Sequence, residues 1–174
     1  VGRLVSAAAV NFEETCRYFR RARVTGTPVR PEFFAIEKKT PGESKRLLVF
    51  GASQGARVFN ELMPKIMERL LSAFPTLDVV HQTGGRHGDS TLAIYRSVGV
   101  SFERVTVTPY LDDMAAQFAA ADLILCRSGA STIAALAAAG RASVLEPFPP
   151  AADDHQRKNA DAFVSAGAAQ MIVE

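Results

Sequence analysis

A turn bracketed by two glycines, Gly51-Ala52-Ser53-Gln54-Gly55, has the residue types of an anion-binding loop. Four apolar residues, Leu47–Phe50, precede it and predict a short buried strand, and apolar residues at helical spacing follow it. Glycines let the backbone approach a ligand, the start of a helix offers unpaired N–H groups, and the Ser53 hydroxyl can donate to a phosphate oxygen. The turn lacks both the Gly-Lys-Ser/Thr of a Walker loop and the full G-x-G-x-x-G spacing. On this segment alone, a phosphate site and a turn that serves packing only are both open.

A second turn of small hydroxylated residues, Arg127-Ser128-Gly129-Ala130-Ser131-Thr132, follows another apolar run. It predicts a second strand-to-helix connection with N–H groups and hydroxyls for an anion. Two helix N-termini that face one cleft suit a diphosphate. The alternative is that Ser or Thr only caps the helix.

The segment Asp153-Asp154-His155-Gln156 reads as a helix start, where acidic residues favour the helix dipole. His155 and Gln156 can hydrogen-bond a sugar. A metal site from these residues has no further cluster to support it, so we expect none. His81, at a strand end, is more typical of a packed, hydrogen-bonded side chain than of a catalyst. No Ser-His-Asp arrangement and no carboxylate pair stands out.

The elements that position these turns alternate between short apolar strands and helices. The predicted strands are Leu47–Phe50, Leu77–His81, Val105–Val107, Leu123–Cys126, Ser143–Leu145 and Ala169–Val173. The predicted helices are Ala56–Leu71, with Pro64 inside it, Ser90–Val98, Leu111–Ala120, a helix from Arg127–Thr132 to Gly140, and one from Asp153 to Phe163. This order predicts a Rossmann-like α/β fold, a parallel sheet with helices on both faces.

All the loops that carry candidate ligand-binding residues then lie at one edge of the sheet, beyond the carboxyl ends of the strands, where such sheets bind ligands. These loops are Gly51–Gly55, His81–Gly85, Pro109–Leu111, Arg127–Thr132 and Pro147–Gln156. Their convergence favours a ligand site over packing turns.

Length and composition limit the classes of function that this chain can have. A chain of 174 residues suits one domain with a sizeable core, and a net charge of +2 gives no argument for nucleic acid. Cys16 and Cys126 match no metal spacing and indicate a reducing compartment. No apolar run reaches the length of a membrane span, and no signal peptide is visible.

The first 46 residues break the alternating pattern. Cys16–Phe19 and Ala22–Val24 resemble short strands. Four arginines lie in or between them: Arg17, Arg20, Arg21 and Arg23. Such a cluster is more typical of a solvated edge than of a binding patch. Thr25–Pro31 contains a glycine and two prolines and predicts a linker without regular structure. Lys38–Arg46 is polar and predicts a second connector.

Several motifs, taken in order, resemble the MurG family of bacterial N-acetylglucosaminyltransferases. They are Thr25–Arg30, Gly51–Arg57, His81–Gly84, Tyr110–Ala115, Cys126–Thr132 and Asp153–Gln156 with Lys158–Ala160. The resemblance implies the C-terminal, donor-binding domain of a GT-B glycosyltransferase that moves GlcNAc from UDP-GlcNAc to lipid I, giving lipid II in peptidoglycan synthesis. The resemblance also implies a division of the chain into three parts. Residues 1–24 would be a truncated tail of the acceptor domain, 25–46 the interdomain linker, and 47–174 the donor domain without the family's final helices.

The resemblance also implies roles for residues. The backbone at Tyr110 and Leu111 would read the uracil edge, with Arg30 nearby. Ser53 and the turn Ala130-Ser131-Thr132 would hold the diphosphate, and His155 and Gln156 would face the GlcNAc. No metal and no cofactor are implied, because helix dipoles neutralise the leaving diphosphate.

The family's proposed catalytic base lies in its N-terminal domain, so no catalytic residue is expected in this chain, which we expect to be inactive alone. The implied partners are UDP-GlcNAc and, through the missing domain, a lipid-linked muramyl-pentapeptide at the cytoplasmic face of the bacterial plasma membrane; no nucleic acid is implied. One departure concerns the donor: the family has a ribose-binding glutamate three residues after the motif threonine, and this chain has Ala135.

Two other functions stay open on the sequence. One is a stand-alone UDP-GlcNAc-binding subunit completed by a membrane partner. The other is a dinucleotide-binding oxidoreductase domain, against which the incomplete glycine pattern speaks.

Overall fold

The apolar run that begins at Leu47 forms the inner part of β3 (Lys45–Phe50), which lies in the middle of a six-stranded sheet. The computed structural model describes residues 4–40, 42–51, 54–149 and 154–173, without the side chain of residue 14. The other strands of this sheet are β4 (Leu77–Gln82), β5 (Val105–Thr108), β6 (Leu123–Cys126), β7 (Ser143–Leu145) and β8 (Ala169–Met171). All six predicted strands are therefore present; β6 and β7 have the predicted ends, and the ends of the other four differ by at most two residues.

The strand order is β5-β4-β3-β6-β7-β8, and every neighbouring pair is parallel. The chain builds the sheet outward from β3 to β5, then crosses back to β6 and builds it outward in the other direction. The order thus reverses between β3 and β6, which is where doubly wound sheets of this order bind ligands. Phe50 pairs with Cys126 in register, so the two strands end at the same edge.

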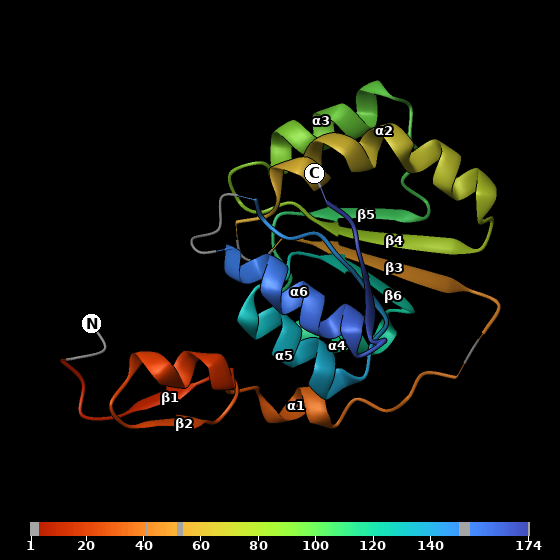
Figure 1. The fold of residues 1–174 in the computed structure, drawn as a ribbon. Helices are drawn as coiled ribbons and strands as arrows, with labels where there is room; N and C mark the ends of the chain where they lie inside the picture. The colour runs from red at the N-terminus through yellow and green to blue at the C-terminus, as the bar shows by residue number, and fades with distance from the viewer. Residues whose placement is uncertain (1–3, 41, 52–53, 150–153, 174) are drawn as a thin grey trace.

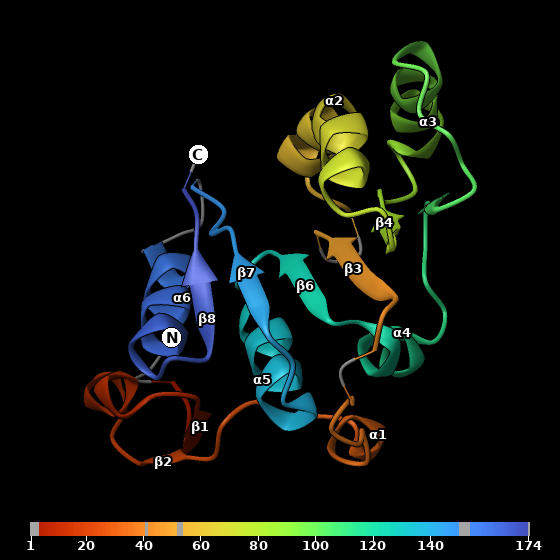
Figure 2. The ribbon, with the colours of Figure 1, turned by 90° about the vertical axis from the view of Figure 1, so that its right-hand side faces the viewer.

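Helices cover both faces (Figures 1 and 2). On one face lie α2 (Arg57–Ala73) and α3 (Gly88–Ser97), over β3, β4 and β5. On the other lie α1 (Pro31–Phe34), α4 (Met114–Ala120), α5 (Ala130–Ala139) and α6 (His155–Ser165). The predicted arrangement of a parallel sheet between two helical layers is confirmed.

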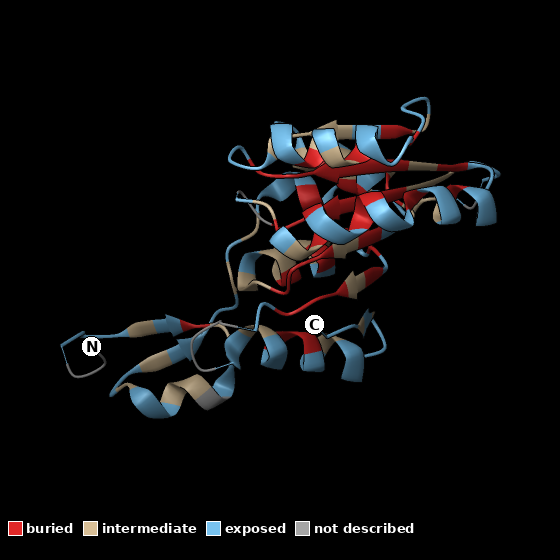
Figure 3. Ribbon diagram, turned by 90° about the horizontal axis from the view of Figure 1, so that it is seen from above, coloured by how far each residue is buried: buried red, intermediate tan, exposed pale blue. Residues whose placement is uncertain are grey.

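Alternation along β3 explains the two cores. Leu48 and Phe50 point into one cluster with Phe118, Ile124 and Leu136, whereas Leu47 and Val49 point into the other. The strand is therefore apolar at successive positions, as expected for a strand buried on both faces. In Figure 3 the buried residues follow the strands and the inner sides of the helices.

On the α2 side, the described helices leave β6, β7 and β8 uncovered (Figure 2). Leu125 pairs with Val49 and with Val144, so these residues share that face. Leu123 there is 38% exposed. No helix within the described ranges has the length and apolar character needed to cross a membrane.

The N-terminal part differs from its prediction. β1 (Ala8–Val10) and β2 (Ala22–Val24) pair in parallel, and a 3-10 helix, η1 (Glu13–Tyr18), lies between them. The strand predicted at Cys16–Phe19 is wrong, while the one at Ala22–Val24 is confirmed. Parallel neighbours need a crossover rather than a hairpin, and here the short helix provides it.

The segment that follows is only in part without regular structure. Residues 25–30 have none, but Pro31 occupies the first turn of α1, where its missing N–H costs nothing. Phe33 of α1 is buried and meets the Phe118 ring edge-on, with centroids 5.1 Å apart. Further along, Lys39 Nζ donates to Asp122 Oδ2 at 2.6 Å. Residues 31–39 are thus fixed to the sheet domain.

Candidate nucleotide-sugar site

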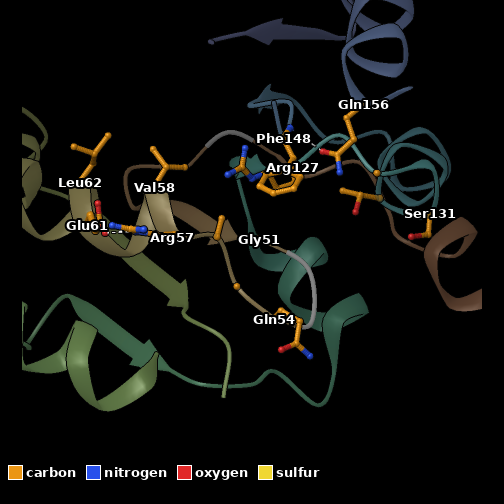
Figure 4. Close-up of a pocket in the computed structure, with 14 residues that line it drawn as sticks. Gly51, Gln54, Arg57, Val58, Glu61, Leu62, Arg127, Ser131, Phe148 and Gln156 are labelled. Atoms are coloured by element: carbon orange, nitrogen blue, oxygen red, sulfur yellow. Dashed lines mark hydrogen bonds and ion pairs between the residues drawn. The ribbon is translucent and has the colours of Figure 1, made fainter. Parts of the chain in front are cut away.

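A cavity of about 780 Å³ opens at the carboxyl edge of the sheet, at the reversal point between β3 and β6 (Figure 4). Three of the five predicted loops, Gly51–Gly55, Arg127–Thr132 and Pro147–Gln156, contribute lining residues. The described residues that line it are Gly51, Gln54, Gly55, Ala56, Arg57, Val58, Glu61, Leu62, Arg127, Gly129, Ser131, Thr132, Phe148 and Gln156. The predicted convergence is therefore found for these three loops, whereas His81–Gly85 and Pro109–Leu111 contribute no residue to this lining.

Gly55, at the end of the turn after β3, packs against the loop after β4 so closely that only glycine fits. Gly55 has φ +73°, and a Cβ added to it would lie 1.9 Å from the Thr83 carbonyl oxygen. Gly84, φ +81°, has the same relation to the Gln54 carbonyl oxygen, at 2.1 Å. The loops after β3 and β4 thus touch through their backbones. Ser53, predicted as a phosphate ligand, lies outside the described residues.

Asn60, one turn into α2, ties that helix to the loop after β4. Its Nδ2 donates to the Thr83 carbonyl oxygen at 2.9 Å, and the side chain is buried. Arg57, at the first position of α2, is paired with Glu61 at 2.6 Å on the cavity rim. That pair raises the pKa of Arg57 and lowers the pKa of Glu61, mainly through the hydrogen bond between them.

The second predicted turn opens α5. Gly129 is the N-cap and has no side chain with which to cap the helix, so the N–H groups of the first turn are not capped by this residue. Ser131 and Thr132 line the cavity, whereas Ala130 does not. The alternative in which Ser or Thr is the N-cap residue does not apply, because that position is glycine.

A smaller slot of about 230 Å³ adjoins the cavity and shares Ser131 and Thr132 with it. Apolar side chains dominate its lining, which comprises Pro28, Val29, Arg30, Phe33, Phe50, Met114, Phe118, Ser131, Thr132 and Ala135. The Arg30 guanidinium lies 5.2 Å from the Phe33 ring centroid and pairs with Glu32 at 3.2 Å.

Two predicted site residues lie elsewhere. Tyr110 is 61% exposed and its carbonyl oxygen accepts from Thr108 Oγ1 at 2.8 Å. Leu111 packs against the core cluster of α4 and α5. Neither lines the cavity or the slot, so in this structure they are separate from Arg30, Ser131 and Thr132.

At the start of α6, Gln156 lines the cavity but the exposed His155 does not. Gln156 Oε1 accepts from the Phe148 amide at 3.1 Å, and its carbonyl oxygen accepts from Ser128 Oγ at 2.7 Å. Asn159 Nδ2 donates to the Ser128 carbonyl oxygen at 2.9 Å. These bonds join α6 to the loop that opens α5.

Sequence reasoning missed a buried ion pair beneath the cavity. Arg127, which is 7% exposed, pairs with Glu146, which is 2% exposed, and Arg127 Nη1 donates to the Pro147 carbonyl oxygen at 3.1 Å. The guanidinium lies between two rings, 5.0 Å from the Phe148 centroid and 5.7 Å from that of Phe59. Arg127 stood in a predicted loop, but nothing in the local pattern marks Glu146 as its partner.

His81 and Tyr95 form a second buried polar pair, with 3.0 Å between His81 Nδ1 and the Tyr95 hydroxyl. Burial lowers the pKa of His81 to about 4 and raises the pKa of Tyr95. Burial also raises the pKa of Cys126. None of the three lines the cavity, in agreement with His81 as a packed histidine. Within the part of the chain that the structure describes, no three His, Cys, Asp or Glu side chains gather as metal ligands.

Comparison with known families and proteins agrees with this geometry. The family Glycosyltransferase family 28 C-terminal domain matches residues 46–174. Two relatives, from Solibacter usitatus and Syntrophus aciditrophicus, are named UDP-N-acetylglucosamine–N-acetylmuramyl-(pentapeptide) pyrophosphoryl-undecaprenol N-acetylglucosamine transferase. The first is 44% identical over 99% of this chain and 47% of its own length, and the second 41% over 100% and 48%. The chain thus spans about half the length of these relatives.

Solved structures show the same fold. The crystal structure of Acinetobacter baumannii MurG superimposes with a TM-score of 0.67 at 34% identity, over 79% of this chain and 40% of that one. A glycotransferase of kitacinnamycin has a TM-score of 0.62 over 88% of this chain and 37% of its own. At 23% identity, this second likeness concerns the fold alone.

Proposed function

Because the chain belongs to glycosyltransferase family 28, as a C-terminal domain of the GT-B fold, we propose that it is the donor-binding half of a MurG-type enzyme. The full enzyme transfers GlcNAc from UDP-GlcNAc to the lipid-linked muramyl-pentapeptide lipid I and so makes lipid II. The observation that carries the proposal is the pair of adjoining cavities at the strand-order reversal, the larger rimmed by two loop-to-helix turns and the smaller lined mainly by apolar side chains.

The donor fits these cavities in one direction. The uracil enters the slot beside Arg30 and Phe33, the diphosphate lies between the Gly51–Gly55 turn and the Ser131–Thr132 turn, and the GlcNAc lies near Gln156. Two helix N-termini then face the diphosphate with N–H groups and positive dipole ends. Tyr110 and Leu111 do not line the slot, and we assign the contact with the base to Arg30 and to the backbone of residues 28–30 instead.

The same arrangement accounts for a transfer reaction without a metal. An acceptor hydroxyl attacks the anomeric carbon of GlcNAc while the bond to the diphosphate breaks, and charge develops on the leaving phosphate oxygen. N–H groups fixed in advance at that position stabilise the transition state more than the ground state. The acceptor and the base that takes its proton belong to a separate acceptor domain in this proposal.

Residues 1–24 are proposed to belong to that acceptor domain. β1 and β2 form a parallel pair, and parallel sheets are found with both faces covered and in more than two strands. Tyr18 and Val24 are nevertheless 62% and 52% exposed. An acceptor domain that adds strands to this pair and helices to its faces would bury such side chains. The acceptor domain would also place the enzyme at the cytoplasmic membrane face, where a lipid-linked acceptor is found.

A dinucleotide oxidoreductase is the weaker candidate. Domains of this strand order that bind NAD hold the ribose hydroxyls with an acidic residue at the end of the second strand. The corresponding strand here, β4, ends His81-Gln82-Thr83, without a carboxylate. A stand-alone donor subunit that binds a membrane partner would use the same donor site and differs only in whether the acceptor domain is a separate chain.

Isothermal titration calorimetry on this chain with UDP-GlcNAc, UDP, uridine and NADH tests the proposal. We expect the two uracil nucleotides to bind competitively and NADH to give no heat. Binding of NADH with displacement by NAD, or no binding of either UDP compound at millimolar concentration, contradicts a UDP-sugar site.

A further inference from the structure

We propose that Glu146 is a positioning residue for the donor sugar, acting through Arg127 and Phe148 on the side-chain amide of Gln156. The inference rests on the proposed function of the cavity as a UDP-GlcNAc site. It adds a residue that does not touch the donor and that no local sequence pattern marks.

The first step is the ion pair itself. Glu146 directly follows β7 and Arg127 directly follows β6, so the pair bridges two neighbouring strand ends. Both residues are more than nine-tenths buried. A buried arginine of this kind requires a buried carboxylate, because an uncompensated charge in the interior is strongly destabilising. Glu146 therefore fixes where the guanidinium of Arg127 lies.

The second step runs from Arg127 to the loop after β7. Nη1 donates to the Pro147 carbonyl oxygen at 3.1 Å, and the guanidinium carbon Cζ lies 5.0 Å from the Phe148 ring centroid. A charge-assisted hydrogen bond and a cation–π contact thus act on two successive residues. Together they set the direction of the Phe148 backbone N–H.

The third step determines which end of the Gln156 amide faces the cavity. The Phe148 N–H can only donate, so the Gln156 atom 3.1 Å away from it is the oxygen. The Nε2 group, with two N–H donors, is then the end that is free to turn to the cavity, as Figure 4 shows. Donors in this place suit the hydroxyl and carbonyl oxygens of an N-acetylated sugar.

The ion pair has a second effect on the site. Arg127 lines the cavity close to the proposed diphosphate position, but its charge is compensated by Glu146. The site thus selects the sugar through a neutral amide. Loss of the Glu146 charge removes this compensation, so the positive charge of Arg127 attracts the diphosphate more strongly while the sugar loses the oriented amide.

The test compares Kd values of UDP and UDP-GlcNAc for the unmodified chain, Glu146→Gln, Gln156→Ala and the double variant. The Kd of UDP divided by the Kd of UDP-GlcNAc measures how much the sugar contributes to binding. We expect Glu146→Gln and Gln156→Ala each to lower this ratio about three- to tenfold, which is the effect of one neutral hydrogen bond. The double variant should lower it no further. UDP itself should bind Glu146→Gln at least as tightly as it binds the unmodified chain.

A purely structural role for Glu146 predicts something else, namely equal losses for both ligands together with a lower melting temperature. That result, additive losses in the double variant, or an unchanged ratio in folded Glu146→Gln overturns the inference. If the unmodified chain binds neither ligand, the donor site is itself wrong and the inference falls with it.

A measurement on the unmodified chain covers the case in which Glu146→Gln does not fold. The side-chain amide signal of Gln156 in a ¹⁵N spectrum is identified by its loss in Gln156→Ala. We expect UDP-GlcNAc to shift this signal and UDP to leave it in place. A signal that responds equally to both ligands contradicts an amide aimed at the sugar.

Discussion

Gly55 and the carbonyl oxygen of Thr83 are packed so closely that a Cβ on Gly55 would lie 1.9 Å from that oxygen. The contact joins the loops after β3 and β4 at the rim of the proposed donor site. Gly84 has the same close contact with the carbonyl oxygen of Gln54, so each of the two loops places a glycine against the backbone of the other. The position of the Gly51–Gly55 turn, and with it any backbone contact to a phosphate, therefore depends on the absence of two side chains.

We expect Gly55→Ala to lower the free energy of unfolding by about 3 kcal/mol or more, from the left-handed backbone and the steric overlap together. Gly99 is the matched control, because it has the same φ of +73° but a Cβ there meets nothing within 4 Å. Gly99→Ala should cost only the conformational part, about 1–2 kcal/mol. Denaturant unfolding of both variants checks this, and equal losses would show that the overlap is relieved at no cost.

The alanine at position 135 lines the apolar slot together with Arg30. A carboxylate there can accept from both ribose hydroxyls, and charge-assisted hydrogen bonds contribute about 1.5–3 kcal/mol. We therefore expect weak UDP binding by the unmodified chain and about tenfold or more tightening in Ala135→Glu. Calorimetry measures the change. Ala135→Gln controls for side-chain size, and a 2′,3′-dideoxyribose analogue of UDP should show no gain. Unchanged or weaker UDP binding by Ala135→Glu means that Ala135 serves packing alone.

The His81–Tyr95 pair predicts acid sensitivity. Burial lowers the pKa of His81 to about 4 from 6.5, so the unfolded chain binds the proton first as the pH falls. The contribution of neutral His81 to the free energy of unfolding is complete above about pH 6.5. It is lost progressively as the pH falls to about 4, by about 3 kcal/mol in all.

Equilibrium unfolding at several pH values checks the expectation for His81. His81→Asn, which keeps a polar atom near the Tyr95 hydroxyl, should flatten the dependence between pH 6.5 and 4. The exposed His87 offers the control variant His87→Asn. Identical pH profiles for His81→Asn and the unmodified chain would show that other groups cause the acid loss.

The isolated chain should not transfer GlcNAc. A donor site alone cannot hold an acceptor hydroxyl at the anomeric carbon, and that positioning supplies a large part of the rate of a two-substrate reaction. Incubation with labelled UDP-GlcNAc and lipid I, followed by extraction of lipid products, checks this. Labelled lipid II above the level of a chain-free control would mean that the acceptor is bound here as well.

The sequence was sufficient to predict the sheet because its strands are short, largely apolar runs that alternate with helical patterns. The same reasoning located the loops that meet in the cavity, since parallel strands end at one edge. It failed at Cys16–Phe19, where a run of suitable strand residues is a 3-10 crossover, because pairing depends on partners distant in the sequence.

The site shows a similar limit. Ser131, Thr132, Arg30 and Gln156 were recognised from motifs and line the cavities, whereas Tyr110, Leu111, Ala130 and His155 do not. The pairing of Arg127 with Glu146 joins residues 19 positions apart through neighbouring strands, which no local pattern encodes. The backbone contact of Gly55 with Thr83 is equally a product of the folded sheet.

The attachment of residues 31–39 to the sheet domain determines where the molecule can pivot. Phe33 is buried against Phe118, Lys39 holds Asp122, and Arg141 Nη2 donates to the Glu37 carbonyl oxygen at 3.0 Å, so α1 moves as one body with the sheet. The Thr25 amide donates to the Val10 carbonyl oxygen at 2.9 Å and stays with the N-terminal unit. We therefore expect any rotation between the two units to occur at residues 26–28, because Val29 already packs against the core of the sheet domain. Pro28, Val29 and Arg30 all line the slot, so a nucleotide bound there would contact the chain beside this pivot and would oppose the rotation.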